Sequence, residues 1–453
     1  MSNSIYERIT FSLVILLALT TMITVQNIVF AQQENLLAND SAKPLMIKGS
    51  SLRIEQVARG LEFPTAMAFV GPDDILVLEK NSGSVRRIVD GKLTEESLLD
   101  VKSAQEGERG MLGIAVSNDT QNGITHTYAF IYFTQSSVSE DGSDDCPPAE
   151  PHCKKGTEPL GNRLYRYELV NDKLINPKLL LDLPATPGPN HNGGVVLVGP
   201  DECVYIVLGD LTQSKRTLAQ NAKNGSSPDG TSGILRINSG GESQDASSHC
   251  GPIVGNNRTL NKYYAYGIRN SFGMDFDPVT GKLWDTENGP FYGDEINLVE
   301  PGFNSGWSIV QGIWKPKGYT IGELQLNPNT DLVNFNGKGI YSLPELASKK
   351  SIGVTALKFL DSDRYGEEYV NDMFVGDFKN GKIYHFDLNN NRTDLAVTGR
   401  LQDKIADTSE ELDESNIVFA QGFAGITDLE VGPYDGYLYI LSYHDGALYR
   451  IVN

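Results

Sequence analysis

The sequence predicts an all-β protein, specifically a six-bladed β-propeller with loop insertions. Six segments repeat one pattern, in which an apolar strand, a turn and a second apolar strand follow one another. No apolar stripe with the helical period runs for any length. The chain also holds 46 Gly, 20 Tyr and 17 Phe residues, a composition that suits many strands joined by tight turns.

The six segments share a Gly-Pro-Asp or Asp-Pro turn in their clearer copies, and two copies continue into a third strand ending in RRIV or YRIV. They begin at Phe63, Glu108, His191, Arg269, Gly353 and Ile426. Their spacing is uneven because loops such as 136–160 and 239–260 are inserted. One small sheet cannot bury both faces alone, and stacking in a ring solves this. A β-sandwich is the alternative, but six similar units fit a sandwich poorly.

The N-terminus has the pattern of a targeting segment. A long apolar run follows Arg8, and small Ala31 precedes polar residues. Residues 1–31 are therefore predicted to be a secretory signal peptide or, because the run is long, a membrane anchor. Residues 32–52 are predicted to be a linker and residues 53–453 the propeller domain. The domain is expected outside the cytoplasm, either secreted or anchored to the outer face of the membrane.

Charge and cysteine content limit which partners the protein can bind and which compartment it can occupy. The net charge is −20, and such a surface repels nucleic acid and anionic lipid. Cys146 and Cys153 bracket a polar, proline-rich insertion, which predicts a disulfide. Zinc bound with the help of His152 is the alternative, but no second close pair of ligands is present. Whether Cys203 and Cys250 pair is left open by the sequence.

Hairpin geometry predicts that unusual polar residues converge on one face. The start of the first strand and the end of the second lie at the same edge of a hairpin. His191 precedes a first strand and Asp210 ends its partner, so the two are expected to be neighbours. Arg269, Glu108 and Lys379 occupy similar edges of other units. In a propeller these edges surround the mouth of the central channel, which predicts a ligand site there.

Each of these residues has both a chemical and a structural interpretation. His191 backed by Asp210 is a candidate general base, or a turn histidine that bonds a neighbouring blade. Arg269 offers a forked donor for an anion, or an inter-blade salt bridge. The stretch ENGPFYGDEIN, residues 287–297, is rich in oxygen ligands and suits calcium, or is a polar turn with Asp294 and Glu295 solvated.

As a set, six motifs resemble the family of soluble glucose dehydrogenases, aldose sugar dehydrogenases and sorbosone dehydrogenases, over about residues 55–453. The motifs are GERGMLGIA (107–115), HNGG…GPD…GD (191–210), SGILRIN (232–238), YGIRNSFGMDF (266–276), ENGPFYGDEINLV (287–299) and GFNSGWS (302–308). The resemblance implies a six-bladed propeller that binds pyrroloquinoline quinone (PQQ) and calcium, and that oxidises the C1 hydroxyl of aldose sugars to lactones by hydride transfer to the quinone. It leaves the electron acceptor unknown.

The resemblance assigns the catalytic roles to three residues. His191 would act as general base for the C1 hydroxyl, and Asp210 would support it. Arg269 would polarise the quinone oxygen that becomes negative.

The resemblance also assigns binding roles. The predicted cofactor-binding residues are Glu108, Asn270, Lys379 and Thr427. The carbonyls of Gly289 and Pro290 would ligate the calcium that touches PQQ, and Glu295 with the carbonyl of Ser305 matches a separate structural calcium site.

The chain departs from the family pattern at two places. In the last unit, Gly425 and Thr427 stand where the soluble glucose dehydrogenases have two arginines that pair with PQQ carboxylates. Before His191, Asn190 stands where those enzymes have an aspartate. Loss of cationic partners weakens the binding of an anion, each charged hydrogen bond contributing about 1.5–3 kcal/mol. Arg216 or Lys215 is a candidate substitute. The alternatives are therefore a non-catalytic binding propeller that has lost the cofactor, or a calcium-dependent lactonase-like hydrolase.

Overall fold

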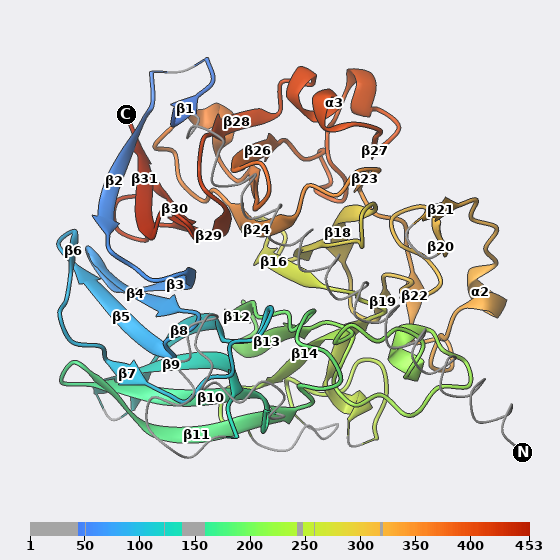
Figure 1. The fold of residues 1–453 in the computed structure, drawn as a ribbon, viewed down its shortest axis with the longest axis horizontal. Coiled ribbons are helices and arrows are strands. Elements are labelled where there is room, and N and C mark those ends of the chain that lie inside the picture. The colour runs from blue at the N-terminus through green and yellow to red at the C-terminus, as the bar shows by residue number, and fades with distance from the viewer. Residues whose placement is uncertain are drawn as a thin grey trace, which may run out of the picture. The chain divides into compact units, whose positions relative to one another are not determined.

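Strands account for nearly all regular structure in the computed structural model, and they group into small antiparallel sheets (Figure 1). The structure describes residues 44–49, 51–121, 123–137, 159–241, 248–257, 259–317 and 320–453. Within them the helices are short: α2 (Pro328–Asp331), α3 (Ser409–Glu414) and the 3-10 turns Leu218–Gln220, Leu260–Lys262, Glu367–Tyr369 and Gly399–Leu401. The expectation of an all-β propeller is confirmed.

The described strands form seven sheets, of which one has only two strands. The first contains β3 (Pro64–Gly71), β4 (Asp74–Glu79), β5 (Ser84–Val89), β6 (Lys92–Leu93) and β7 (Leu99–Asp100). The second contains β8 (Met111–Gln121), β9 (Ile124–Gln135), β10 (Gly161–Val170) and β11 (Lys173–Leu183). The third contains β12 (Val196–Val198), β13 (Cys203–Leu208), β14 (Gly233–Asn238), β15 (Tyr263–Tyr266), β19 (Phe303–Asn304) and β22 (Ile340–Tyr341).

The remaining sheets follow in chain order. The fourth contains β16 (Ser271–Phe276), β17 (Leu283–Glu287), β18 (Asp294–Val299), β23 (Leu346–Ser348) and β27 (Ile405–Ala406). The fifth contains β24 (Val354–Phe359), β25 (Met373–Asp377), β26 (Lys382–Phe386), β28 (Val418–Gln421) and β1 (Met46–Ile47). The sixth contains β29 (Ile426–Val431), β30 (Leu438–Ser442), β31 (Ala447–Val452) and β2 (Arg53–Arg59). The small sheet pairs β20 (Lys315–Lys317) with β21 (Thr320–Gly322).

Each of the six repeated segments folds as the expected antiparallel hairpin. The sequence missed the strands that come from insertions. β19 and β22 extend the third sheet through parallel pairings, and β23 and β27 extend the fourth. These strands are two or three residues long, too short to show a period in the sequence.

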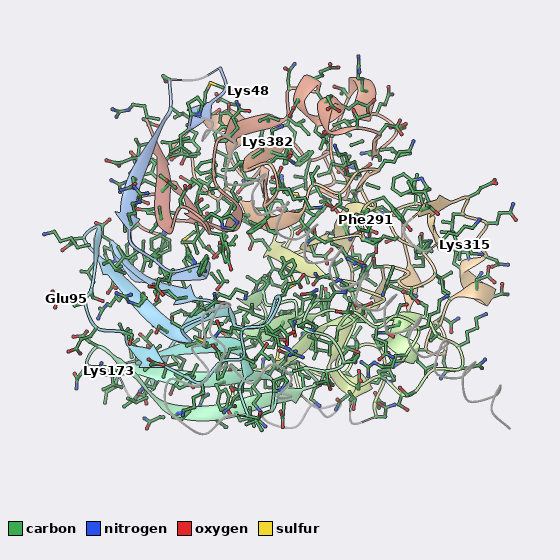
Figure 2. The ribbon with its side chains drawn as sticks, in the orientation of Figure 1. Lys48, Glu95, Lys173, Phe291, Lys315 and Lys382 are labelled. Atoms are coloured by element: carbon green, nitrogen blue, oxygen red, sulfur yellow. A yellow bond between two sulfur atoms is a disulfide. The ribbon has the colours of Figure 1, made fainter. Side chains whose placement is uncertain are left out.

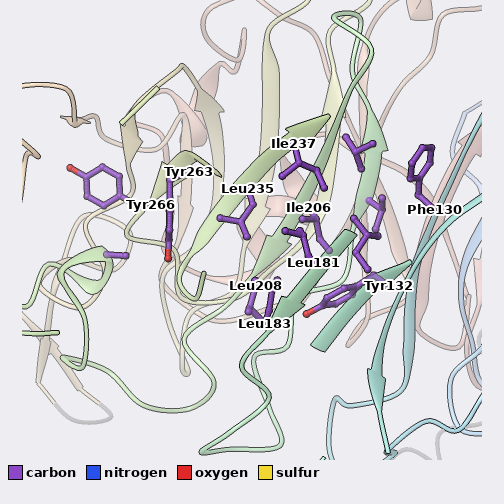
Figure 3. Packing of buried hydrophobic residues seen from close by; sticks show 14 of the residues in the cluster. Phe130, Tyr132, Leu181, Leu183, Ile206, Leu208, Leu235, Ile237, Tyr263 and Tyr266 are labelled. Atoms are coloured by element: carbon purple, nitrogen blue, oxygen red, sulfur yellow. The ribbon is translucent and has the colours of Figure 1, made fainter. Parts of the chain in front are cut away.

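Alternate residues of a central strand face different cores, which explains why these strands are apolar throughout. In β13, Ile206 and Leu208 belong to the core shared with the second sheet (Figure 3), whereas Tyr205 and Val207 pack with Met274 of the fourth sheet. All six residues of β13 are buried. Side chains of a strand point alternately to opposite faces, so a sheet between two neighbours needs apolar residues at every position.

The first strands of the sheets contact one another in a closed series. β3 contacts β8, β8 contacts β12, β16 contacts β24, β24 contacts β29, and β29 contacts β3, while β13 contacts β16. The last sheet is completed by β2, whose residues pair with β31 from Arg53↔Val452 to Arg59↔Ala447. Strands from the two ends of the described chain therefore close the ring. Charged side chains such as Glu95 and Lys173 lie at the outer edges of their sheets (Figure 2).

The start of the folded unit differs from the predicted linker. The compact unit runs from Leu45 to Asn453, and β1, inside the predicted linker 32–52, pairs with β28. Residues 1–43, with the predicted signal peptide or anchor, lie outside the described residues, as do Cys146 and Cys153. Within the described part of the chain, no helix combines the length and apolar character needed to cross a membrane.

A disulfide joins Cys203 at the start of β13 to Cys250, the pair whose state the sequence left open. Both cysteines are buried in the core between the third and fourth sheets. The bond closes a loop with a sequence separation of 47 residues. Disulfides persist in oxidising compartments, which agrees with the expectation of an extracytoplasmic protein.

We predict that the Cys203→Ala/Cys250→Ala variant is less stable than the wild type by about 4 kcal/mol, because the unfolded chain gains the entropy of an open loop of this length. Urea unfolding followed by fluorescence measures the difference. Dithiothreitol should destabilise the wild type more than the variant, in which only the predicted Cys146–Cys153 bond is left to reduce. Equal unfolding free energies of the wild type and the variant without reductant would contradict the prediction.

Candidate active site

Residues at the beginnings of the first strands line a cavity of about 480 Å³. The hairpin geometry brings their neighbours at the ends of the second strands to the same place. Eight of the predicted site residues line the cavity: Glu108, His191, Arg269, Asn270, Gly289, Pro290, Lys379 and Thr427. Asp210, Glu295 and Ser305 do not line it, but they contact groups that belong to this wall or support it.

The His191 imidazole is held by Asp210. Nδ1 of His191 lies 2.5 Å from Oδ1 of Asp210, and Asp210 is 1% exposed. The same carboxylate accepts hydrogen bonds from the Thr212 backbone N–H (2.9 Å) and from Trp307 Nε1 (2.8 Å). Because the carboxylate is an acceptor, Nδ1 carries a proton and Nε2 of the neutral ring is the basic nitrogen. The pairing with Asp210 therefore fixes the tautomer of the neutral imidazole and leaves Nε2 as its acceptor.

The backbone at His191 is also constrained. His191 has a φ of 63°, a left-handed conformation that is uncommon for residues other than glycine. Its N–H donates to Oε2 of Glu108 (2.6 Å). Two residues later, a side chain at Gly193 would lie 2.3 Å from the Val207 carbonyl oxygen, and Gly193 has a φ of 63°. The turn therefore requires glycine in order to pack against β13.

Glu108 connects two segments of the cavity wall. Besides the His191 N–H, its Oε2 accepts a hydrogen bond from Nδ2 of Asn270 (3.2 Å). Asn270 is buried, and its Oδ1 has no hydrogen-bond partner among the described residues. A buried amide oxygen without a donor is costly. This cavity-lining residue therefore keeps one buried acceptor without a donor among the described residues.

Arg269 is a half-buried cation. Its Nη1 donates to the Asn288 carbonyl (2.7 Å), and its guanidinium carbon lies 5.5 Å from the centre of the Trp307 ring. Burial lowers the pKa of Arg269, while the charges of Asp210 and Glu108 raise it. An arginine remains protonated despite such a shift. The cavity thus holds a fixed positive charge beside the His191–Asp210 pair.

Asp294 fixes the loop that carries Gly289 and Pro290. Its carboxylate accepts hydrogen bonds from the N–H groups of Gly289 (2.9 Å), Ile352 (2.8 Å) and Gly353 (2.7 Å). Burial raises the pKa of Asp294, and the backbone hydrogen bonds lower it. The alternative interpretation of this stretch as a solvated polar turn is wrong for Asp294 and Glu295, because both are 2% exposed.

Three buried acids lie together behind this loop. Ser305 Oγ lies 2.6 Å from Oε2 of Glu287 and 3.3 Å from Oε2 of Glu295. Burial and the nearby carboxylate of Asp285 raise the pKa of Glu295 to about 8, and burial with the charge of Glu295 raises the pKa of Glu287 well above its usual value. Gln311 donates to Glu295, but its own Oε1 has no partner among the described residues. The cluster has oxygen ligands that suit a hard cation, and the charge of such an ion would favour the ionised carboxylates.

The structure explains why arginine is absent at the two positions occupied by Gly425 and Thr427. Gly425 has a φ of 81°, and a Cβ there would lie 3.0 Å from the Phe378 ring, so a long side chain is disfavoured. The Thr427 hydroxyl donates to the Pro64 carbonyl (2.9 Å), which leaves only its acceptor lone pairs for a ligand. Of the suggested substitutes, Arg216 pairs with Asp229 instead, and neither it nor Lys215 lines the cavity.

Sequence reasoning missed Lys80, which also lines the cavity. It directly follows β4, whereas Lys379 follows the equivalent strand β25 by two residues. Lys379 is exposed, and its Nζ donates to Ser351 Oγ (2.7 Å). Alignment of the six hairpins by the ends of their second strands would have found Lys80. Without such an alignment, a single lysine does not indicate a binding site, because most lysines are ordinary surface residues.

Comparison with known proteins identifies the family of the chain. A family model described as glucose/sorbosone dehydrogenase matches residues 61–450. Aldose sugar dehydrogenase YliI of Escherichia coli strain K12 is 24% identical over 399 residues, covering 87% of this chain and 90% of the relative. Quinoprotein glucose dehydrogenase B of Acinetobacter calcoaceticus is 27% identical over 332 residues, covering 69% of this chain and 62% of the relative.

Solved structures share the fold. The apo-form of the soluble aldose sugar dehydrogenase from Escherichia coli has a TM-score of 0.62 at 20% identity, covering 88% of this chain and 99% of that chain. The PQQ-bound aldose sugar dehydrogenase from Streptomyces coelicolor has a TM-score of 0.58 at 19% identity, covering 90% and 99%. With the family model matching nearly all of the compact unit, the resemblance expected from the motifs is confirmed, and the chain belongs to the glucose/sorbosone dehydrogenase family.

Proposed function

We propose that this protein is a PQQ- and calcium-dependent dehydrogenase that oxidises the C1 hydroxyl of aldose sugars to lactones. The observation that carries the proposal is the His191–Asp210 pair, because His191 lines the same cavity as Arg269. Relatives named aldose sugar dehydrogenase and quinoprotein glucose dehydrogenase support the substrate class and the quinone. The proposal names the class of sugar and the cofactor, and it names neither the particular sugar nor the natural electron acceptor.

The residues present fit PQQ. The cavity volume of about 480 Å³ is within the range of small-molecule sites, roughly 300–1,000 Å³. Arg269 and Lys379 line the cavity and offer positive charge to an anionic quinone. When bound, PQQ supplies a two-electron acceptor for the hydride that leaves C1.

The chain's own residues divide the remaining work. Nε2 of His191 takes the proton of the C1 hydroxyl, and Asp210 stabilises the imidazolium that results. Arg269 places a fixed positive charge where negative charge develops on the oxidant, in a site where burial strengthens electrostatic interactions. Glu108 accepts hydrogen bonds from the His191 N–H and from Asn270, and so fixes the position of one segment relative to the other.

Calcium is assigned to two places. The carbonyls of Gly289 and Pro290, on the loop fixed by Asp294, would hold the ion that contacts the cofactor. Glu295 and Ser305 would hold a structural ion, which would neutralise the buried acid cluster that they form with Glu287.

We also propose that the propeller has six blades, one for each of the six sheets that have four or more strands. The mature protein is proposed to act outside the cytoplasm, in agreement with the Cys203–Cys250 disulfide.

The two alternative functions make different demands on the cavity. A binding propeller without catalysis would follow if the absence of arginine at Gly425 and Thr427 prevented PQQ binding. A lactonase would require several carboxylate or imidazole ligands around one ion in the cavity. Among the described residues, the groups of three close His, Cys, Asp or Glu ligands are Cys203–His249–Cys250, which contains the disulfide, and Asp372–His385–Asp387, and neither group lines the cavity.

We predict that His191→Asn lowers kcat by about 100- to 10,000-fold, because the general base is lost. Asp210→Asn should cause a loss of similar size, since an amide donor to Nδ1 moves the imidazole proton onto Nε2. Turnover of aldoses is measured with added PQQ, calcium and an artificial electron acceptor. PQQ binding, followed by calorimetry, should persist in both variants.

Two results would reject the dehydrogenase assignment. One is the absence of turnover by the wild type with every aldose tried. The other is equal turnover by the wild type and His191→Asn. Tight PQQ binding by the wild type would exclude the propeller that has lost its cofactor, and lactone hydrolysis in the absence of quinone would favour the hydrolase.

We further predict that calcium stabilises the protein through the acid cluster. At a free calcium concentration 1,000 times the dissociation constant, binding adds about 4 kcal/mol to the free energy of unfolding. Thermal unfolding with calcium and with EGTA measures the effect. Glu295→Gln should reduce the response to calcium, whereas Glu345→Gln, a matched change of another buried acid, should retain it. An identical response in both variants would remove Glu295 from the ligand set.

A further inference from the structure

Lys80 lies where two sheets meet at the cavity. It directly follows β4, and its N–H donates to the Phe63 carbonyl before β3 (3.1 Å). Its own carbonyl accepts the N–H of Met111 at the start of β8 (3.0 Å). A side chain at Gly110 would lie 2.6 Å from Cγ of Lys80, so the lysine stem is closely packed. The backbone and stem are fixed while the side chain lines the cavity.

The Lys80 ammonium is buried, and no carboxylate of the described residues forms an ion pair with it. The residue is 9% exposed, and Nζ donates to two neutral oxygens, Oδ1 of Asn81 (3.2 Å) and the Gln105 carbonyl (3.3 Å). Burial lowers the pKa of Lys80 to about 8, and the charge of Glu108 acts in the opposite direction. Lysines are almost never fully buried unless they are paired. The third donor position of this ammonium is therefore suited to an anion.

The position of Lys80 relates it to the missing arginines. The Thr427 hydroxyl of β29 bonds the Pro64 carbonyl of β3, and Pro64 is paired with Glu79 in the β3–β4 ladder. Lys80 is the next residue after Glu79. Lys80 and Thr427 both line the cavity, so the neighbouring sheet places a cation at the same end of its strands.

We propose that Lys80 binds a carboxylate of the ligand in the cavity, in place of the cations that Gly425 and Thr427 do not supply. The inference rests on the proposed function, because the carboxylate is taken to be one of the three carried by PQQ. A sugar acid offers the same chemical group, so the experiment must separate the two sources. Lys80 and Lys379 then contact the anionic groups of the cofactor, while Arg269 remains beside the His191–Asp210 pair.

The test is calorimetric titration of PQQ, with calcium present, into cofactor-free protein. Lys80→Met should weaken PQQ binding by about 10- to 100-fold, because a charged hydrogen bond is lost. Lys80→Arg should bind within about threefold of the wild type. Lys173→Met is the matched control, because Lys173 pairs with Glu96 at the outer edge of its sheet (Figure 2), and it should bind as the wild type does.

A second ligand separates a carboxylate contact from a general loss of structure. The trimethyl ester of PQQ lacks the three charges, so the wild type and Lys80→Met should bind it equally weakly. Unequal binding of the ester, with Lys80→Met the weaker, would assign the effect to packing and overturn the proposal. Thermal unfolding of each variant verifies that it is folded.

The remaining outcomes are distinct. Failure of the wild type to bind PQQ would reject the proposed function itself. PQQ binding by the wild type and equal binding by Lys80→Met would overturn the role of Lys80 while leaving the proposed function intact. If PQQ affinity is unchanged but kcat/KM for galacturonate falls relative to galactose in Lys80→Met, the carboxylate belongs to the substrate, and the cofactor assignment is overturned.

Discussion

The need to bury both faces of every sheet is the constraint on which the rest of the structure depends. β13 is apolar at all six positions because its two faces pack against different neighbours. A row of such sheets exposes an apolar face at each end unless the ends meet. They meet where β2 pairs with β31. Once the ring is closed, the first strands contact one another in series, and the polar residues beside them are gathered around one cavity.

Buried carboxylates fix the positions of the loops that meet at the cavity. Acids that end second strands accept backbone N–H groups of nearby loops: Glu79 from Glu62, Glu287 from Arg269, and Asp377 from Asn380. Burial raises the pKa of each of these acids, which means that the folded state disfavours their charged forms. Polar networks of this kind cost stability, but they position loops accurately when each group is satisfied. Loops rather than strands carry the candidate catalytic groups, so this accuracy matters most at the cavity.

Much of the hairpin architecture could be predicted because it depends on local pattern. Pairs of apolar runs separated by turns located all six hairpins, and strand-edge geometry predicted that His191 lies beside Asp210. The Cys203–Cys250 bond could not be predicted, because a separation of 47 residues carries no local signal. The burial of Glu295 was missed for a similar reason. Its surroundings come from insertions whose short strands show no period.

The charge of the cavity cannot be inferred from the charge of the chain. The protein has a net charge of −20, yet the acids of the cavity wall already have partners within the protein. Glu108 accepts two N–H groups, and Glu430 pairs with Lys358 at 2.8 Å. Among the described residues, Lys80 donates to two neutral oxygens, Oδ1 of Asn81 and the Gln105 carbonyl. At short range and low dielectric, the cations that line the cavity act on a ligand more strongly than distant surface charge that salt screens. An acidic protein can therefore hold an anion, because the local balance at the wall decides what binds.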